Sequence, residues 1–248
     1  MKTQISIIIP MYNEEENLKR GVLTEVRDYL DKQKLSYEVL ISDDESTDQS
    51  REIVKSLIKN MPKFQLLENP HGGKPFAIKA GVEKAEGELC LFTDMDQSTP
   101  ISEIEKLLPY LENDYGVAIG SRGTLRKDFP MYRKLMSWGF RSLRRVLLLR
   151  DLVDTQCGFK AFKTEVGREI FDKMTIFKKR GSGWKVGAWD VEFLFVAEKL
   201  GYKIKEVPIV WMDNDIATGK KRNFVKESRE MFSEVFRVIL NDWEGRYG

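Results

Sequence analysis

The chain lacks the residues that a disulfide scaffold or a membrane span would need. Only two cysteines occur among its 248 residues, which excludes a disulfide framework and is typical of a reducing compartment. No stretch approaches the roughly 20 consecutive apolar residues of a spanning helix. The apolar run within residues 1–10 is also too short for a secretory signal. We therefore expect a cytoplasmic protein that meets a membrane only at its surface.

The chain also has little net charge. A formal charge of +2 argues against binding of polyanions by bulk electrostatics, so we expect no nucleic-acid partner. The charge is unevenly distributed, because residues 121–150 contain nine Lys or Arg and a single acidic residue, Asp128. Hydrophobic residues make up 42% and charged residues 32%, without repeats or low-complexity segments, which indicates a folded domain with a substantial core.

Short apolar runs alternate with helical patterns over the first 120 residues. The predicted strands are Ile5–Ile9, Glu38–Ser42, Phe64–Leu67, Glu88–Thr93 and Val117–Gly120. The predicted helices are Glu14–Leu30, Asp48–Lys59, Pro75–Ala85 and Ser102–Leu111, with N-caps at Ser46 or Thr47 and at Ser102. This alternation favours an α/β fold with a mostly parallel sheet flanked by helices, in which ligands bind beyond the carboxyl ends of the strands.

The second half of the chain is less regular. Its predicted elements are a helix over Met131–Leu149, a strand over Gly158–Lys163, a helix over Trp189–Leu200, a strand over Tyr202–Trp211 and an amphipathic helix over Phe224–Trp243. We expect one domain over residues 1–212, with a nucleotide-binding part in 1–120 and an acceptor part in 121–212. A flexible loop and the amphipathic helix then occupy 213–248.

Two acidic clusters follow predicted strands. Asp94 and Asp96 come directly after an apolar strand, and neighbouring carboxylates repel each other unless a cation compensates them. Their hard oxygen ligands suit Mg²⁺ or Mn²⁺, which would bridge to phosphate oxygens. Asp43 and Asp44 end a second strand, where they too would reach the ligand crevice. The alternative for an isolated pair of this kind is a solvated acidic turn.

Four motifs in order resemble the family 2 inverting glycosyltransferases of the GT-A fold. They are the opening strand and loop in Ile7–Glu15, the DDGSTD-like segment Asp43–Asp48, the glycine-lysine loop Asn69–Lys74 and the D-x-D of Asp94–Asp96. Further segments resemble the dolichyl- and polyprenyl-phosphate glucosyltransferases and mannosyltransferases of that family, most of all the glucosyl-transferring members. These are Gly120–Arg122, Tyr132–Lys134, Asp154–Lys160, Trp189–Glu192 and Glu206–Pro208.

The resemblance implies a role for each matched residue. Base and ribose of a nucleotide-sugar donor would be bound by Pro10, Tyr12, Glu14, Asp43 and Asp44, with Lys74 nearby. Asp94 and Asp96 would hold the metal and its diphosphate, Arg122 and Arg133 would meet phosphates, and Asp154 would lie at the reaction centre. This chain departs from the pattern at three positions, with Glu45 in place of glycine, Pro75 after the loop lysine, and Gln97 after the D-x-D.

The implied reaction is transfer of one hexose, glucose favoured, to a polyprenyl or dolichyl phosphate. UDP-glucose is the favoured donor and GDP-mannose a possible one. A phosphate acceptor is already anionic and requires no strong base, whereas a saccharide hydroxyl would require a carboxylate such as Asp154 or Asp190. The Q-x-x-R-W signature of processive members is absent, so we expect a single transfer.

Three other functions remain open from the sequence. They are transfer to a saccharide hydroxyl, nucleotidylyl transfer, and sugar-nucleotide binding by a non-catalytic subunit. Nucleotidylyl transfer would want a basic, glycine-rich loop after the first strand, where this chain has Asn13 and three glutamates. We interpret His71 as a loop residue without proton chemistry. The basic helix Met131–Leu149, helped by Phe224–Trp243, is expected to rest on an anionic membrane surface.

Overall fold

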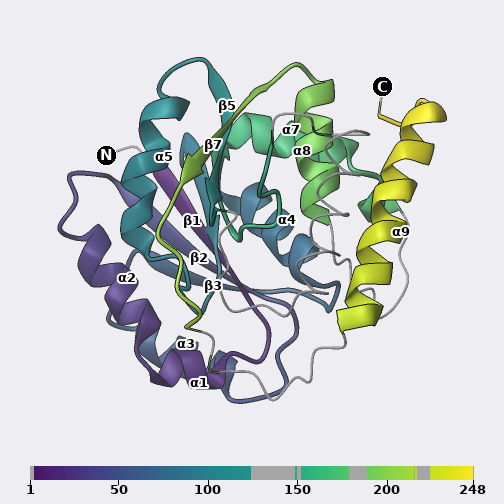
Figure 1. Cartoon of the computed structure of the whole chain (residues 1–248). Coiled ribbons are helices and arrows are strands. Elements are labelled where there is room, and N and C mark those ends of the chain that lie inside the picture. Colours follow the sequence, from purple (N-terminus) through teal and green to yellow (C-terminus); the bar gives the residue numbers. More distant parts are fainter. Residues whose placement is uncertain are drawn as a thin grey trace.

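A seven-stranded mixed sheet organises the part of the chain that the structure describes (Figure 1). This computed structural model describes residues 3–123, 149, 152–178, 189–214, 216 and 224–247, with the backbone alone for 224–231. The strand order is β3-β2-β1-β4-β6-β5-β7. The strands are β1 (Ile5–Met11), β2 (Tyr37–Asp43), β3 (Phe64–Glu68), β4 (Leu89–Thr93), β5 (Tyr115–Ser121), β6 (Phe159–Lys163) and β7 (Lys203–Pro208).

Only β6 runs against its neighbours. It pairs antiparallel with both β4 and β5, whereas β3, β2, β1 and β4 are parallel and β5 is parallel to β7. The predicted mostly parallel sheet is therefore confirmed. Parallel strands leave their carboxyl ends at the same edge, and the chain order reverses next to β1, between β2 and β4. A doubly wound sheet binds ligands at such a switch point.

Helices cover both faces of the sheet, as predicted. Along β1, alternate side chains enter two separate cores: Ile7 and Ile9 face one, and Ile8 faces the other. The first core is closed by α1 (Glu15–Lys19), α2 (Val22–Leu30), α3 (Ser50–Ile58) and α5 (Ile104–Leu111). The second is closed by α4 (Lys74–Lys84), α7 (Thr164–Lys173), α8 (Trp189–Lys199) and α9 (Phe224–Trp243). Each fully buried isoleucine contributes roughly 1.5–3 kcal/mol, so these cores stabilise the fold.

Several local predictions were wrong. The single helix predicted over Glu14–Leu30 is divided into α1 and α2, because Gly21 adopts φ 95. Helix α3 begins at Ser50, whose N–H donates to Asp48 (3.0 Å), so neither Ser46 nor Thr47 is its N-cap. Ser102 lies inside a short 3₁₀ turn, η1 (Ile101–Glu103), and is no cap either. Helix α7 and the following turn η2 (Thr175–Lys178) were not predicted.

The C-terminal helix α9 is tied to the domain by a buried polar cluster. Glu192 of α8 is fully buried and accepts hydrogen bonds from Arg237 Nη2 (2.9 Å) and from the Tyr247 hydroxyl (2.9 Å). A buried carboxylate needs such partners, because an uncompensated charge in the interior is strongly destabilising. Among the described helices, none is both long and apolar enough to cross a membrane.

Candidate active site

Three neighbouring strands deliver the predicted site residues to one edge of the sheet. Pro10 lies on β1 opposite Ser42 of β2, and Asp43 ends β2. Asp94 follows β4, the other neighbour of β1. Because these strands are parallel, the three loops that follow them meet at the switch point. The loops that carry the predicted site residues therefore share one edge of the sheet.

The loops after β1 and β2 are cross-linked by hydrogen bonds. The Asn13 N–H donates to Ser46 Oγ (3.0 Å), and the Thr47 N–H donates to Asn13 Oδ1 (2.8 Å). The Glu14 N–H donates to Ser50 Oγ (2.8 Å), while its carboxylate accepts from Asn17 Nδ2 (2.7 Å). Glu14, predicted to bind the nucleotide-sugar donor, is therefore held at a fixed place at the start of α1.

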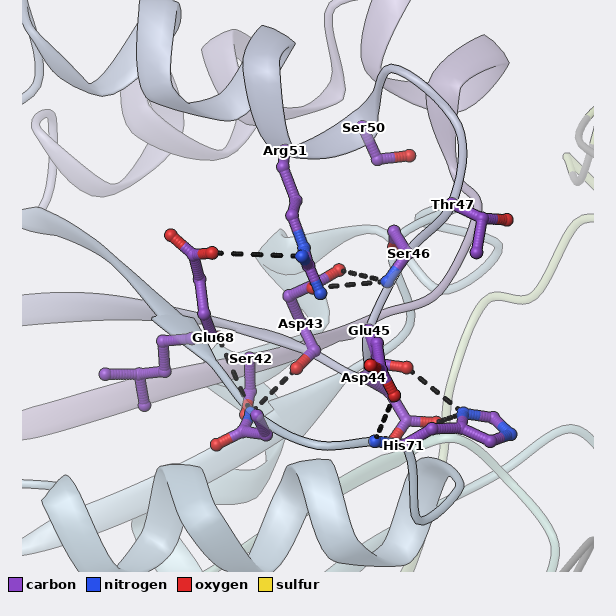
Figure 2. Close-up of polar contacts among 12 residues, drawn as sticks. Ser42, Asp43, Asp44, Glu45, Ser46, Thr47, Ser50, Arg51, Glu68 and His71 are labelled. Carbon is purple, nitrogen blue, oxygen red and sulfur yellow. Dashed lines mark hydrogen bonds and ion pairs between the residues drawn. The ribbon is translucent and has the colours of Figure 1, made fainter. Parts of the chain in front are cut away.

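The two aspartates at the end of β2 have different surroundings (Figure 2). Asp43 is fully buried; Arg51 Nε donates to it (2.5 Å) and so does the Ser46 N–H (3.2 Å). Asp44, 3% exposed, turns to the glycine-lysine loop and accepts from the N–H groups of Gly72 (2.8 Å) and Gly73 (2.9 Å). Both carboxylates thus shape the loops, and their contact with a donor stays a prediction.

His71 stands beside these aspartates. Its Nδ1 lies 2.9 Å from Asp44 Oδ2, and its ring centroid is 5.0 Å from that of Tyr12. The predicted base-binding residues Tyr12 and Asp44 are therefore joined through His71, a residue to which the sequence assigned only a loop role.

Lys74, at the start of α4, and Asp94, after β4, form an ion pair. Burial lowers the pKa of Lys74, but the carboxylate of Asp94, helped by Asp190 and Asp96, outweighs this and raises it above its usual value. Asp96 Oδ1 accepts the N–H of Ser98 (2.8 Å), which fixes the second carboxylate in the same turn. The structure therefore brings Lys74, predicted to lie near the nucleotide, beside Asp94 and Asp96, the two residues predicted to hold the metal and its diphosphate.

The backbone at Gly158 lies against Asp94. A Cβ added to Gly158 would lie 2.0 Å from Asp94 Oδ2, far closer than any real contact. The segment before β6 thus sets the position of this carboxylate, and only glycine leaves room for it. This requirement was not predicted, although Gly158 belongs to a segment that carried the family resemblance.

Each of the three site loops contains one non-glycine residue in the left-handed region. These are Asn13 (φ 56) after β1, Glu45 (φ 65) after β2 and Gln97 (φ 48) after β4. Such conformations cost of order 1–3 kcal/mol in backbone strain and concentrate at functional sites. Two of the three, Glu45 and Gln97, are positions where the sequence departs from the family pattern. The usual glycine at position 45 is explained by this backbone conformation.

Arg122 and Asp154, from the part of the chain predicted to bind the acceptor, form a bidentate pair. Arg122 Nε and Nη2 donate to the two carboxylate oxygens at 2.7 and 2.8 Å, and the Arg122 N–H adds a third bond (3.0 Å). Burial raises the pKa of Asp154, but Arg122 more than offsets it, so that pKa lies below its usual value. Glu206 accepts the N–H of Asp154 (2.9 Å). The structure thus holds Asp154 as an ionised, fully engaged group.

Lys160 and Asp190 form a third ion pair, which sequence reasoning missed. Lys160 is fully buried on β6; its ammonium donates to Asp190 (2.5 Å) and to the Cys157 carbonyl (2.5 Å). Asp94 is the main charge that raises the pKa of Lys74, and Asp154 the main charge that raises that of Arg122; the charge of Asp190 adds a smaller contribution to both. Burial raises the pKa of Cys157 to about 11, which keeps its thiol protonated and not nucleophilic.

Similarity to known proteins identifies the family of this chain. Residues 6–171 match the model of glycosyl transferase family 2. The chain belongs to glycosyltransferase family 2. A dolichyl-phosphate beta-glucosyltransferase of Dictyostelium discoideum is 32% identical to this family 2 glycosyltransferase over an alignment of 263 residues. The alignment covers 97% of this chain and 76% of that protein. The family predicted from the sequence motifs is therefore confirmed.

Solved structures confirm the GT-A fold of this family 2 enzyme. Mannosyl-3-phosphoglycerate synthase from Rubrobacter xylanophilus has a TM-score of 0.67 at 16% identity, covering 98% of this chain and 75% of that one. Glucosyl-3-phosphoglycerate synthase from Mycobacterium tuberculosis, in complex with Mn²⁺, UDP and glucosyl-3-phosphoglycerate, has a TM-score of 0.64 at 15% identity, covering 96% and 80%. At these identities the likeness concerns the fold alone.

The residues of this family 2 glycosyltransferase fit a divalent cation. Within the described ranges no group of three His, Cys, Asp or Glu side chains is arranged for a metal. Mg²⁺ is commonly bound by one or two carboxylates together with substrate phosphates and water. Asp94 and Asp96 could provide the carboxylates. The predicted phosphate contact Arg133 and the basic segment Met131–Leu149, apart from Leu149, lie outside the described residues.

Proposed function

We propose that the enzyme transfers one glucose from UDP-glucose to a polyprenyl phosphate, with inversion at the anomeric carbon. One observation carries the choice of acceptor. Both carboxylates that the sequence named as candidate general bases are ion-paired, Asp154 with Arg122 and Asp190 with Lys160. A depressed pKa makes Asp154 a weak base, whereas a hydroxyl acceptor needs a competent one. A phosphate oxygen carries its own negative charge and needs none.

The donor side supports a nucleoside diphosphate leaving group. Asp94 and Asp96 would hold Mg²⁺ or Mn²⁺, which would neutralise charge developing on the diphosphate. Lys74 brings a further cation to the same place. Tyr12 and Asp44, which both contact His71, would bind the base and ribose. The Dictyostelium relative is named for dolichyl phosphate and glucose, and the Mycobacterium structure contains Mn²⁺ and UDP. The first supports the proposed sugar and acceptor, and the second supports the proposed nucleotide and metal.

The proposed step is a direct displacement at the glucose anomeric carbon. An oxygen of the acceptor phosphate forms the new bond while the bond to the diphosphate breaks, and the electron pair leaves with UDP. No proton has to be removed from the acceptor. In this step Arg122, held in orientation by Asp154, would meet a phosphate group.

A transfer assay with purified protein tests the proposal. UDP-glucose, GDP-mannose and Mn²⁺ are supplied with a short polyprenyl phosphate or with a free oligosaccharide, and the glycosylated product is measured. We expect glucosyl phosphoprenol from UDP-glucose alone. A thermal-shift panel of the same nucleotides should show the largest stabilisation by the true donor, because ligand binding to the native state raises its stability. Transfer to the oligosaccharide instead would contradict the proposal.

We further propose that the enzyme attaches peripherally to an anionic membrane, where a polyprenyl acceptor resides. The outer side of α9 exposes Phe236 (52%), Leu240 (54%) and Trp243 (82%), which recur at helical spacing. An interfacial helix presents such an apolar face to lipid. The basic residues of 121–150 would add on the order of 1 kcal/mol each near an anionic surface.

Liposome sedimentation tests the attachment. Replacement of Phe236, Leu240 and Trp243 by serine should reduce sedimentation with phosphatidylserine vesicles, and replacement of Arg141, Arg144 and Arg145 by glutamine should reduce it further at low salt. Transfer to a short, water-soluble prenyl phosphate should survive the serine changes. Unaltered sedimentation of both variants would contradict membrane attachment through these residues.

A further inference from the structure

Glu45 adopts an unusual conformation at the end of β2. Its φ of 65 lies in the left-handed region, where glycine is favoured and a side chain adds strain. The side chain is exposed, so burial of apolar surface does not compensate the strain. A residue that keeps a side chain under these conditions needs another reason for it.

That reason is visible in the contact of Glu45 with the glycine-lysine loop (Figure 2). Glu45 Oε2 accepts the backbone N–H of His71 at 3.0 Å. The preceding residue, Asp44, accepts the N–H groups of Gly72 and Gly73. Two consecutive carboxylates therefore bind three consecutive backbone N–H groups, and a hydrogen bond to a charged acceptor is stronger than a neutral one. We call this set of contacts the loop clasp.

The loop clasp controls where two predicted donor contacts lie. Directly after Gly73 the chain enters α4, whose first residue, Lys74, reaches Asp94. At the other end of the loop, the His71 ring packs beside Tyr12. A displacement of the loop would therefore move Lys74 and His71 together. Asp44 alone would hold Gly72 and Gly73, and Glu45 extends the hold to His71.

We propose that Glu45 is a positioning residue for the nucleotide-sugar donor. It acts through the His71 N–H and keeps the loop of residues 71–74 in the conformation that binds the donor. The proposal rests on the proposed function, because it takes this crevice as the donor site. It gives a role to the side chain of Glu45, at a position where the family pattern has glycine.

Three substitutions at position 45 separate the hydrogen bond from the backbone strain. Glu45→Gln keeps an acceptor oxygen and the strain, Glu45→Ala keeps the strain without an acceptor, and Glu45→Gly removes both. We expect the donor KM of Glu45→Gln to lie within twofold of that of the parent protein. Ala and Gly should each raise the donor KM by about fivefold, the effect of one lost hydrogen bond, with kcat unchanged within twofold.

Thermal stability distinguishes a positioning role from a purely structural one, because in a purely structural role donor KM would follow the melting temperature. Glu45→Gly should melt at a higher temperature than Glu45→Ala, because glycine relieves the left-handed strain, although both bind the donor equally weakly. If Ala and Gly keep the parent donor KM, or if KM follows the melting temperature across the three variants, the proposal is overturned.

A binding measurement separates this proposal from the proposed function. Calorimetric titration with UDP and Mn²⁺ reports the Kd of the donor site without any acceptor. If the parent protein binds UDP but transfers nothing to polyprenyl phosphate, the proposed acceptor is wrong and the Kd values of the three variants still decide the role of Glu45. If the parent protein binds no UDP, both proposals are overturned.

Discussion

Replacement of Gly158 by alanine tests how Asp94, the carboxylate predicted to bind the metal, is positioned. The new Cβ would lie 2.0 Å from Asp94 Oδ2, whereas ordinary van der Waals contact begins at 3.4 Å. The carboxylate must therefore move by about 1.4 Å, and a misplacement of about 1 Å in a catalytic site costs on the order of 100-fold in rate. Gly158 itself is outside the left-handed region, so alanine adds no backbone strain. We expect kcat/KM to fall by roughly 100-fold.

Stability should change little in the same variant. The Asp94 side chain is 37% exposed and can rotate toward solvent, so the melting temperature should fall by no more than about 4 °C. Gly116→Ala is a matched control in the same sheet, where the new Cβ would lie 3.0 Å from the Tyr202 ring and away from the carboxylates. It should leave kcat/KM within about twofold. Full activity of Gly158→Ala at limiting Mn²⁺ would refute the assigned position of Asp94.

Further substitutions test other parts of the site. Asp96→Asn should abolish transfer with the melting temperature retained, and unchanged turnover at saturating Mn²⁺ would remove Asp96 from the metal site. Asp44→Ala should raise the donor KM more than it lowers kcat, because it releases the Gly72 and Gly73 N–H groups; a loss confined to kcat would contradict this. Arg122 lowers the pKa of Asp154, so their pairing stabilises the fold above about pH 4 and is lost as pH falls further. Melting curves of Asp154→Asn should therefore depend less on pH below about pH 4, and an unchanged dependence would refute the pairing.

Sequence patterns predicted the sheet because strands and helices leave local, periodic patterns of apolar residues in the sequence. The run Ile5–Ile9 is apolar except for Ser6, since β1 is buried on both faces, and turn residues mark its end. Motif order then located Asp94, Asp96 and Asp44, because parallel strands bring their carboxyl ends together whatever the loops contain. These predictions needed no knowledge of distant contacts.

The elements and residues that were missed depend on long-range partners. Lys160 reads as a polar strand residue, and nothing local indicates that Asp190, thirty positions later, neutralises it inside the protein. The steric role of Gly158 needs the position of Asp94, more than sixty residues earlier. The break at Gly21 was ambiguous, because an isolated glycine within a helical pattern is often tolerated.

The pairing of both candidate bases makes one comparison decisive for the proposed chemistry. Initial rates are measured with UDP-glucose and Mn²⁺ on two acceptors of equal chain length, a polyprenyl phosphate and the corresponding polyprenol. With Asp154 and Asp190 bound to Arg122 and Lys160, transfer to the phosphate should proceed and transfer to the alcohol should be undetectable. Comparable rates on the two acceptors would show that the site contains a working general base and would contradict the account.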